Sequence, residues 1–426
     1  MSSPVPSPMV SLLTRSREST RSLSLSSLAQ RNAALEAVAR EIEARGSDIL
    51  KANRLDQEAA QRAGMSTPLL DRLILDETRL RKMLQSLREV IELPDPLGTS
   101  RELGTRPNGL RIQRRRIPLG VLAIIYEARP NVTVEASSLA IKSGNAIVLR
   151  GGKEALLSNH ALSAAVRSGL EKSGLPIDCV QLIEDTDRER VTELLGAVGY
   201  VDLAIPRGGP ELMKMVDAYA RVPVIRHGLG ITHLFLDASA NATMASDIVF
   251  NSKVQRPGVC NALETLLVHR SLLTTELWRP LAERLVTQGN VELRVDEEVA
   301  QSLRSHRILH RAAQDDDWDT EFMALTLAVR TVGSLDEALN QIAAHGSHHT
   351  ASIVTEDSAH AERFLQSVDA ACVLWNASTR FNDGNELGLG AEIGISTTKM
   401  HAFGPMGLNE LTAEKFVVYG AGQVRS

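Results

Sequence analysis

A cysteine preceded by a helix-breaking pair is the residue of this sequence best suited to covalent chemistry. Cys260 follows Pro257 and Gly258 in the stretch NSKVQRPGVCNALETLLVH, and an apolar run comes directly after it. Such a cysteine can lie at an exposed turn or at a helix N-terminus, where amide donors lower the pKa of the thiol and favour the nucleophilic thiolate. The alternative is a small buried hydrophobe, the usual role of a cysteine outside a disulfide. Cys179 and Cys372 lie inside apolar strand patterns, which favours that alternative for both.

Two glycine-rich segments could bind phosphate groups. One consists of Arg150, Gly151, Gly152 and Lys153, and the other of Arg207, Gly208 and Gly209. Each follows an apolar strand pattern and precedes a helical one. Ligands of doubly wound sheets bind where the carboxyl ends of the strands open into a crevice, and a helix N-terminus behind two glycines can receive a pyrophosphate. The fingerprint GxGxxG is absent, so either segment could also be a plain turn between a strand and a helix.

Three further clusters of polar residues have simpler explanations than a ligand site. They are the arginine-rich residues 111–116, the aspartates 315–317, and His345, His348 and His349. The arginines alternate with apolar residues beside a turn, which indicates the solvated face of a strand. No further oxygen ligands are spaced around the aspartates, which favours a surface loop over a divalent-cation site. Adjacent histidines of an extended chain point to opposite sides, so we expect a substrate or structural role and no metal.

Composition narrows the classes of partner and compartment. The chain has 426 residues, with 47 Lys and Arg against 52 Asp and Glu, and a formal charge of −5. A chain without a global basic field is not expected to bind nucleic acid, and no apolar run is long enough to predict a membrane span. Three cysteines without a CxxC pair argue against a disulfide framework and a thiolate zinc site. We therefore expect a reducing, cytoplasmic environment.

The spacing of apolar residues predicts an α/β protein that begins with helices. Residues 10–92 are expected to be nearly all helical, and Asn108-Gly109 predicts a hairpin turn between two strands. From 133 to 237 helices alternate with short apolar strands, including one in VPVIRHG (222–228), and a second such series covers 242–375. This alternation indicates a doubly wound parallel sheet. Residues 414–422 predict a lone strand that needs a partner.

The N-terminal segment allows two interpretations. Residues 1–27 are rich in Ser and Arg with Glu18 as the only acid, which is the composition of an organellar transit peptide. The apolar positions from Val10 onward instead suit an amphipathic helical hairpin that folds with the domain.

Five segments together carry a resemblance to a known family. They are SGNAIVLRGGKEA (143–155), NSKVQRPGVCNALETLLVH (251–269), HGSHH (345–349), STRFNDGNELGLGAEIGIST (378–397) and GPMGLNELT (404–412). They resemble the γ-glutamyl phosphate reductases, a family of the aldehyde dehydrogenase superfamily, and the similarity extends over residues 10–426. The resemblance implies an aldehyde dehydrogenase-like fold with three parts: a cofactor-binding domain (1–104 and 121–225), a catalytic domain (226–392) and an oligomerisation element (105–120 and 393–426).

The resemblance also implies a reaction, namely reduction of L-glutamyl 5-phosphate by NADPH to L-glutamate 5-semialdehyde in proline biosynthesis. In this scheme Cys260 displaces phosphate to form a thioester, which splits a difficult hydride transfer into two easier steps. Asn131 would stabilise the oxyanion, and Glu321 would hold the nicotinamide ribose hydroxyls. The general-base glutamate that hydrolytic relatives carry roughly 34 residues before the nucleophile is missing, because that zone reads VIRHGLGITH. This absence suits an enzyme that exchanges its thioester with phosphate.

Two sets of binding residues follow from the resemblance. Those expected to hold NADPH are Arg150, Gly151, Lys153, Arg207, Gly208, Gly209 and Glu321. Those expected to contact substrate are Arg226, His227, His345, His349, Arg380 and Asn382. Arg150 and Lys153 would favour the 2′-phosphate of NADPH, whereas Glu154 could instead accept from a free 2′-hydroxyl.

This chain departs from the family pattern at three positions, where Gln341, Ala351 and Phe403 replace a His, an acid and an Arg. The departures leave open a different acyl phosphate or semialdehyde as the substrate. A non-enzymatic scaffold and a Cys-His hydrolase that uses His269 or His233 are weaker alternatives, because the chain keeps Cys260 and both glycine-rich turns, and no orienting acid lies at recognisable spacing. The family also implies a homo-oligomer, a dimer or larger, and possible coupling to glutamate 5-kinase.

Overall fold

The computed structural model describes residues 7–226 and 228–425, apart from the side chains of Pro68 and Pro210. The chain divides into two compact units. The first consists of Met1–Arg226, Gly388–Gly394 and Met406–Ser426, and the second of His227–Leu387 and Ile395–Pro405. Both units contain a parallel sheet, as the alternation of helices and strands predicts.

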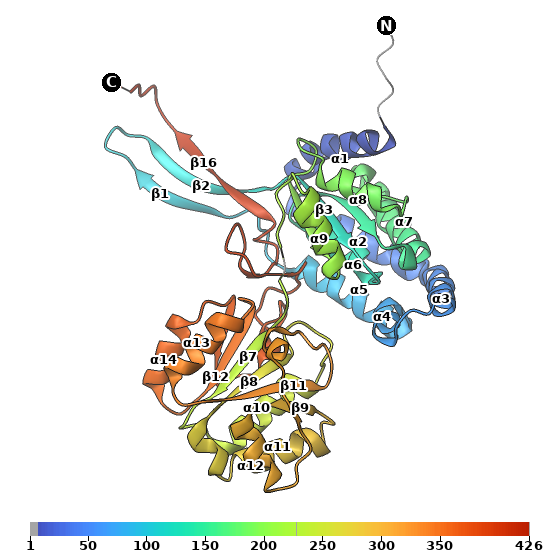
Figure 1. The fold of residues 1–426 in the computed structure, drawn as a ribbon. Coiled ribbons are helices and arrows are strands. Elements are labelled where there is room, and N and C mark those ends of the chain that lie inside the picture. Colours follow the sequence, from blue (N-terminus) through green and yellow to red (C-terminus); the bar gives the residue numbers. More distant parts are fainter. Residues whose placement is uncertain (1–6, 227, 426) are drawn as a thin grey trace. The chain divides into compact units, whose positions relative to one another are not determined.

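Helices form most of the first unit (Figure 1). They are α1 (Pro8–Leu25), α2 (Leu28–Ala44), α3 (Gly46–Arg62), α4 (Thr67–Leu73), α5 (Glu77–Glu92), α6 (Asn131–Lys142), α7 (Leu156–Ser173), α8 (Arg188–Leu195) and α9 (Pro210–Tyr219). The expectation of helices over residues 10–92 is confirmed by α1 to α5. Met9 and Leu13 of α1 are buried in the same core as Val121 and Ala146 of the sheet, so residues 8–25 fold with this unit.

The sheet of the first unit has the order β5-β4-β3-β6, and all of its neighbouring strands are parallel. Its strands are β3 (Val121–Tyr126), β4 (Ala146–Gly151), β5 (Val180–Leu182) and β6 (Leu203–Arg207). Every residue of β3 and β4 is buried, which explains the uninterrupted apolar runs. Because β4 and β6 both flank β3, the two glycine-rich turns lie at the same edge of the sheet.

A second sheet of this unit joins distant parts of the sequence. It has three antiparallel strands in the order β1-β2-β16, namely β1 (Ser100–Thr105), β2 (Arg111–Pro118) and β16 (Thr412–Tyr419) (Figure 1). Asn108 and Gly109 form the predicted turn between β1 and β2, and Gly109 has a φ of 85°. The predicted C-terminal strand finds its partner in β2, so both expectations are confirmed.

The second unit has a seven-stranded parallel sheet in the order β10-β9-β11-β8-β7-β12-β13. Its strands are β7 (Thr232–Leu236), β8 (Leu263–His269), β9 (Glu292–Val295), β10 (Arg311–Ala312), β11 (Thr326–Val332), β12 (Thr350–Val354) and β13 (Cys372–Trp375). The helices are α10 (Ala242–Val254), α11 (Trp278–Thr287), α12 (Glu297–Arg304), α13 (Leu335–His345) and α14 (Ser358–Ser367). The short strands β14 (Ile395–Ser396) and β15 (Gly404–Pro405) pair with each other.

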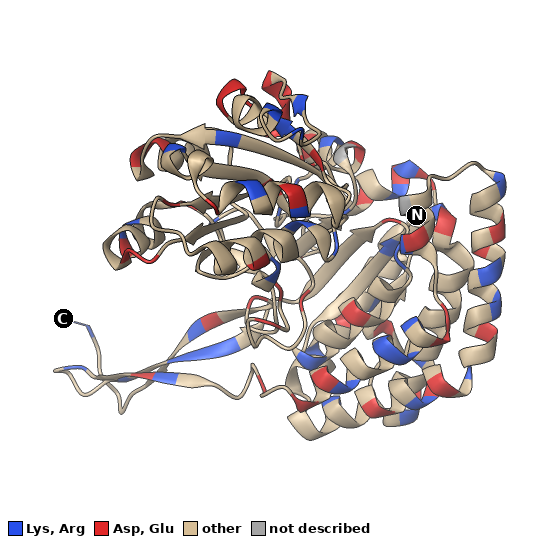
Figure 2. Cartoon of the chain, turned by 90° about the horizontal axis from the view of Figure 1, so that it is seen from below, with Lys and Arg blue, Asp and Glu red and all other residues tan. Residues whose placement is uncertain are grey.

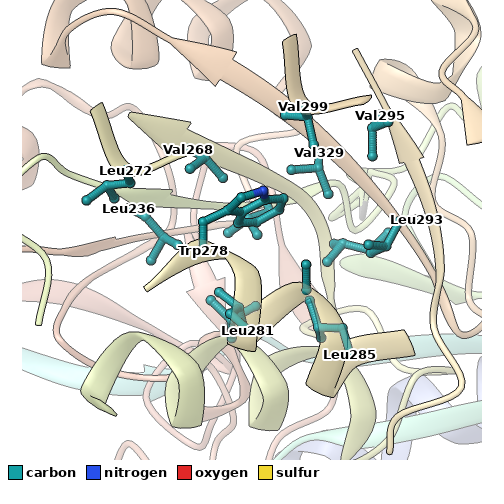
Figure 3. Packing of buried hydrophobic residues seen from close by; sticks show 14 of the residues in the cluster. Leu236, Val268, Leu272, Trp278, Leu281, Leu285, Leu293, Val295, Val299 and Val329 are labelled. Atoms are coloured by element: carbon teal, nitrogen blue, oxygen red, sulfur yellow. The ribbon is translucent and has the colours of Figure 1, made fainter. Parts of the chain in front are cut away.

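Alternate side chains of this sheet fill two cores. Leu234 and Leu236 of β7 pack with α10, α11 and α12, whereas Phe235 packs with α13 and α14 on the other face. Figure 3 shows the larger core, in which Trp278 lies among the aliphatic side chains of the strands and of α11 and α12. The Trp278 indole N–H donates to Ser302 Oγ at 2.9 Å, so the ring is buried without leaving its polar atom unsatisfied.

One predicted strand is wrong. The described part of residues 222–228 forms only an isolated bridge between Val224 and Ala204. Pro223 interrupts the apolar run, and a proline cannot donate a backbone hydrogen bond to a ladder.

Positions occupied by Lys or Arg and by Asp or Glu are interspersed along the helices (Figure 2). No helix among the described residues is long and apolar enough to span a membrane. The same part of the chain contains no group of three or more His, Cys, Asp or Glu side chains arranged to hold a metal ion.

Candidate active site

Cys260 lies on the connection from α10 to β8, and its side chain is partly exposed. The structure places it in a turn, and α10 ends before it, so of the two expected positions the turn is the observed one. The neighbouring Asn261 is buried and fixes this turn. Its side-chain Nδ2 donates to the backbone carbonyl oxygen of Asn382 at 2.9 Å. Its backbone carbonyl oxygen accepts from Thr379 Oγ1 at 2.7 Å. The segment around the 3-10 helix Thr379–Phe381 therefore holds the cysteine in place.

Arg380 on that 3-10 helix is a charged neighbour of the cysteine. Its Nε donates to Gln255 Oε1 at 2.8 Å. Burial lowers the pKa of Arg380 and the like charge of Arg256 lowers it further, whereas Asp383 and Cys260 act in the opposite direction. An arginine stays protonated in spite of such shifts, so its positive charge favours the thiolate form of the cysteine.

Gly230 brings Cys260 and Glu321 together. A Cβ atom built on Gly230 would lie 2.4 Å from the carbonyl oxygen of Cys260, 2.8 Å from its Cα and 2.8 Å from Glu321 Oε1. Cys260 and Glu321, the residue expected to bind ribose, are thus neighbours in the second unit. This close approach needs a residue without a side chain. Gly230 meets that need, and it belongs to the segment VIRHGLGITH (224–233), which contains no carboxylate.

The two expected histidines differ in their surroundings. His349 is buried, its Nδ1 lies 2.7 Å from Thr350 Oγ1, and Asn382 Nδ2 donates to the same hydroxyl at 2.7 Å. His345 is partly exposed and its Nδ1 lies 2.9 Å from Asp319 Oδ1. The structure therefore connects His349 with Asn382, which also holds the cysteine turn, whereas His345 pairs with an acid.

Two expected substrate residues lie outside the described part of the second unit. Arg226 belongs to the first unit, is exposed and forms an ion pair with Asp217 at 3.0 Å. His227 lies outside the described residues.

The carboxyl ends of β3, β4 and β6 form the second candidate region. Gly208 and Gly209 follow β6, and the N–H of Gly209, just before α9, donates to Glu127 Oε2 at 3.0 Å. A Cβ on Gly208 would lie 2.7 Å from the same oxygen. A carboxylate oxygen thus already lies against this helix N-terminus, which shows that the turn accepts an anion. Arg207 ends β6 and is partly exposed.

The two cations expected at the turn after β4 lie in different surroundings. The Arg150 guanidinium is buried and donates to the carbonyl oxygens of Thr186 at 2.5 Å and of Asp187 at 3.3 Å. Lys153 is exposed. Glu154 accepts from the N–H of Ala128 at 2.5 Å, so its carboxylate is engaged within the protein.

Asn131 is the first residue of α6, in the first unit. Its amide nitrogen donates to Glu135 Oε1 at 2.9 Å, one turn along the same helix.

Several residues close to Cys260 in the second unit are not predicted from the sequence. Gly230 carries no signal beyond its place in GLG, because the contact is with a residue 30 positions away. Lys253 and Glu264 form a buried ion pair on either side of Cys260. A glutamate inside the apolar run LETLLVH was a usable signal, since a charge in a buried strand needs a partner.

Comparison with known proteins assigns the class first. The family model described as the aldehyde dehydrogenase family matches residues 11–302. This match, the two parallel sheets and the cysteine turn define an oxidoreductase of the aldehyde dehydrogenase type.

Individual relatives narrow the class. The gamma-glutamyl phosphate reductase of Anaeromyxobacter dehalogenans is 52% identical over 417 residues, covering 98% of this chain and 97% of that one. The protein of the same name from Meiothermus ruber is 50% identical over 409 residues and 96% of each chain. The crystal structure of gamma-glutamyl phosphate reductase from Thermotoga maritima has a TM-score of 0.94 and 42% identity, and covers 98% of this chain and 100% of that chain. The chain therefore belongs to the gamma-glutamyl phosphate reductase family.

Proposed function

We propose that the protein reduces L-glutamyl 5-phosphate to L-glutamate 5-semialdehyde with NADPH and releases phosphate, as a step of proline biosynthesis. The name gamma-glutamyl phosphate reductase, which its relatives carry, supports this substrate. The observation that carries this proposal is the Cys260 turn, which Asn261 fixes beside the Arg380 guanidinium and against Glu321. A partly exposed thiol with a neighbouring cation is the arrangement that a nucleophilic cysteine requires.

Cys260 is the proposed nucleophile. Its thiolate attacks the acyl carbon, a C–S bond forms, the bond from that carbon to the phosphate oxygen breaks, and inorganic phosphate leaves. The Arg380 guanidinium stabilises the thiolate and attracts the acyl phosphate, while the Cys260 backbone N–H and the Asn131 amide are the proposed donors to the oxyanion. NADPH, when bound, supplies the hydride that reduces the thioester carbon, so that the thiolate leaves and the aldehyde is released.

The absence of a carboxylate in residues 224–233 supports transfer to phosphate over hydrolysis. A thioester needs an activated water to be hydrolysed, and the general base for that water is missing from VIRHGLGITH. Gly230 of this segment lies directly against Cys260 and brings no carboxylate of its own to that residue.

The residues of the first unit fit a dinucleotide cofactor. Gly208 and Gly209 precede α9, and the bond from the Gly209 N–H to Glu127 supports anion binding at this helix start, where the cofactor phosphates would replace the carboxylate. Lys153 is the exposed cation at the turn after β4, and we assign it the 2′-phosphate. Glu154 Oε1 accepts the N–H of Ala128, so this carboxylate has a partner within the protein. Arg150, which binds backbone carbonyls, is proposed to hold the shape of this turn.

The proposed substrate contacts are His349, Asn382 and Arg380 beside the cysteine turn, with Arg226, His227 and His345 as further candidates. Ala351, one of the departures from the family, is buried in the core between the sheet and α13 and α14. Its replacement of an acid therefore concerns packing, which weakens the argument for a different substrate.

We further propose that the protein works in the cytoplasm as a homo-oligomer of two or more chains, joined through β1, β2 and β16, and that it is functionally coupled to glutamate 5-kinase. The exposed Phe416 and Val418 on β16 support a protein contact at this sheet.

The test is phosphate-dependent oxidation of glutamate 5-semialdehyde with NADP, the reverse of the proposed reaction. Several aldehydes of similar length serve as competitors. We expect activity that requires phosphate and is highest with glutamate 5-semialdehyde. Equal or greater activity with another semialdehyde would establish the alternative substrate, and activity without phosphate would contradict the acyl phosphate chemistry.

A further inference from the structure

Lys253 and Glu264 form an ion pair that the proposed reaction does not use. Lys253 lies in the last turn of α10 and Glu264 near the start of β8, so the pair joins the two ends of the connection that carries Cys260. The Lys253 Nζ lies 2.6 Å from Glu264 Oε2, and both side chains are fully buried.

Stability alone does not explain this pair. Removing two charges from water is costly, and apolar residues of similar volume often replace a buried ion pair with no loss of stability. A simple link between α10 and β8 could therefore be apolar. The second oxygen of Glu264 indicates what the carboxylate does in addition.

Glu264 Oε1 accepts the backbone N–H of Met323 at 3.2 Å. Met323 has a φ of 52°, a left-handed conformation that is unfavourable for a residue with a side chain and needs support from its surroundings. It lies two residues after Glu321. The buried carboxylate thus anchors the segment that presents Glu321.

Glu321 and Glu264 also affect each other electrostatically. Burial raises the pKa of Glu264 to about 7, Lys253 opposes this shift, and Glu321 adds to it. Burial lowers the pKa of Lys253, which Glu264 opposes. The three charged groups therefore form one connected cluster, and the Glu321 end of that cluster reaches Gly230 and Cys260.

We propose that Glu264, held by Lys253, is a positioning residue that sets the place of Glu321 through the Met323 N–H and thereby determines how tightly the nicotinamide ribose is bound. This inference rests on the proposed function, from which it takes the role of Glu321.

Two double variants separate the anchor from the charges. Lys253→Met with Glu264→Gln removes both charges but keeps a side-chain oxygen for the Met323 N–H. Lys253→Met with Glu264→Leu removes that oxygen as well, and Glu264→Met in the same background is a second apolar version should the leucine protein fail to fold. Neither design leaves an uncompensated buried charge.

The first measurement is amide hydrogen exchange of the peptide that contains Met323, in protein without cofactor. We expect faster exchange in the apolar variants and wild-type exchange in the glutamine variant. The second is equilibrium binding of NADPH, followed by its fluorescence, together with steady-state kinetics. We expect the dissociation constant and KM for NADPH to rise about tenfold in the apolar variants, with kcat changed by less than about threefold, and near-wild-type values in the glutamine variant.

Equal NADPH affinity in the glutamine and apolar variants would overturn the proposal, whether both match wild type or both are equally impaired. A lower unfolding temperature with unchanged affinity would show a structural role only and would overturn it as well. Failure of the proposed function has a different signature, because wild-type protein would then neither bind NADPH nor act on the semialdehyde, whereas the exchange difference at Met323 would persist.

Discussion

Gly230→Ala should damage catalysis while leaving the fold intact. The added methyl group would lie 2.4 Å from the carbonyl oxygen of Cys260 and 2.8 Å from both its Cα and Glu321 Oε1. Two of these three atoms belong to the backbone of Cys260, so rotation of a side chain cannot relieve the overlap. Gly230 is not among the residues with a positive φ, so alanine meets no backbone strain of its own there.

The expected size of the effect follows from the displacement. Carbon and oxygen atoms need roughly 3.5 Å of separation, so the cysteine turn or residue 230 must move by about 1 Å. A misplacement of that size at a reacting group can lower the rate by about a hundredfold. We therefore expect kcat/KM for glutamate 5-semialdehyde oxidation to fall by about a hundredfold.

Two other glycines supply controls for this experiment. A Cβ on Gly258, two residues before Cys260, would meet only the Met323 carbonyl oxygen at 3.8 Å, so Gly258→Ala should be nearly silent. A Cβ on Gly289 would lie 2.7 Å from the Leu285 carbonyl oxygen, so Gly289→Ala should lower stability with little effect on kcat/KM. A Gly230→Ala protein that folds and retains more than about a third of wild-type kcat/KM would refute the packing argument.

Two further substitutions test the cofactor turn and a buried histidine. Lys153→Ala should lower kcat/KM for NADPH about tenfold and leave that for NADH unchanged, because an exposed cation contributes mainly to the 2′-phosphate contact; an unchanged ratio of the two values would reject the role of Lys153. Burial lowers the pKa of His233 from 6.5 to about 4. The neutral ring therefore contributes its full stability above pH 6.5, and about 3 kcal/mol of the free energy of unfolding is lost as the pH falls from 6.5 through 4. His233→Leu should therefore flatten the fall in unfolding free energy between pH 7 and 4, measured with urea, whereas the exposed His306→Gln should not; equal slopes in all three proteins would contradict this.

Local patterns predicted much of the fold, because they depend on neighbouring residues. The buried strands β3 and β4 are read from uninterrupted apolar runs, and the hairpin from Asn108-Gly109. The strand predicted at 222–228 is wrong. Its apolar run suggests a strand, but Pro223 within that run cannot donate a hydrogen bond to the ladder.

Less of the candidate site could be predicted from the sequence, because its contacts join segments that are far apart in the chain. The Pro-Gly pair before Cys260 singles this residue out in the sequence. The sequence does not reveal that Asn261 binds the 379–382 segment or that Gly230 lies against Cys260. It places Arg150 after a strand, yet the direction of its guanidinium, toward the carbonyl oxygens of Thr186 and Asp187, depends on a loop 36 residues away.

The most direct test of the central claim is the loss of the nucleophile. Burial raises the pKa of Cys179 to about 12 and that of Cys372 to about 11, so neither thiol should react at neutral pH. Cys260→Ala should lower phosphate-dependent oxidation of glutamate 5-semialdehyde by at least about a thousandfold with NADPH binding retained, whereas Cys179→Ala and Cys372→Ala should keep most of the rate. A Cys260→Ala enzyme within about tenfold of the wild-type rate would contradict a covalent mechanism at this cysteine.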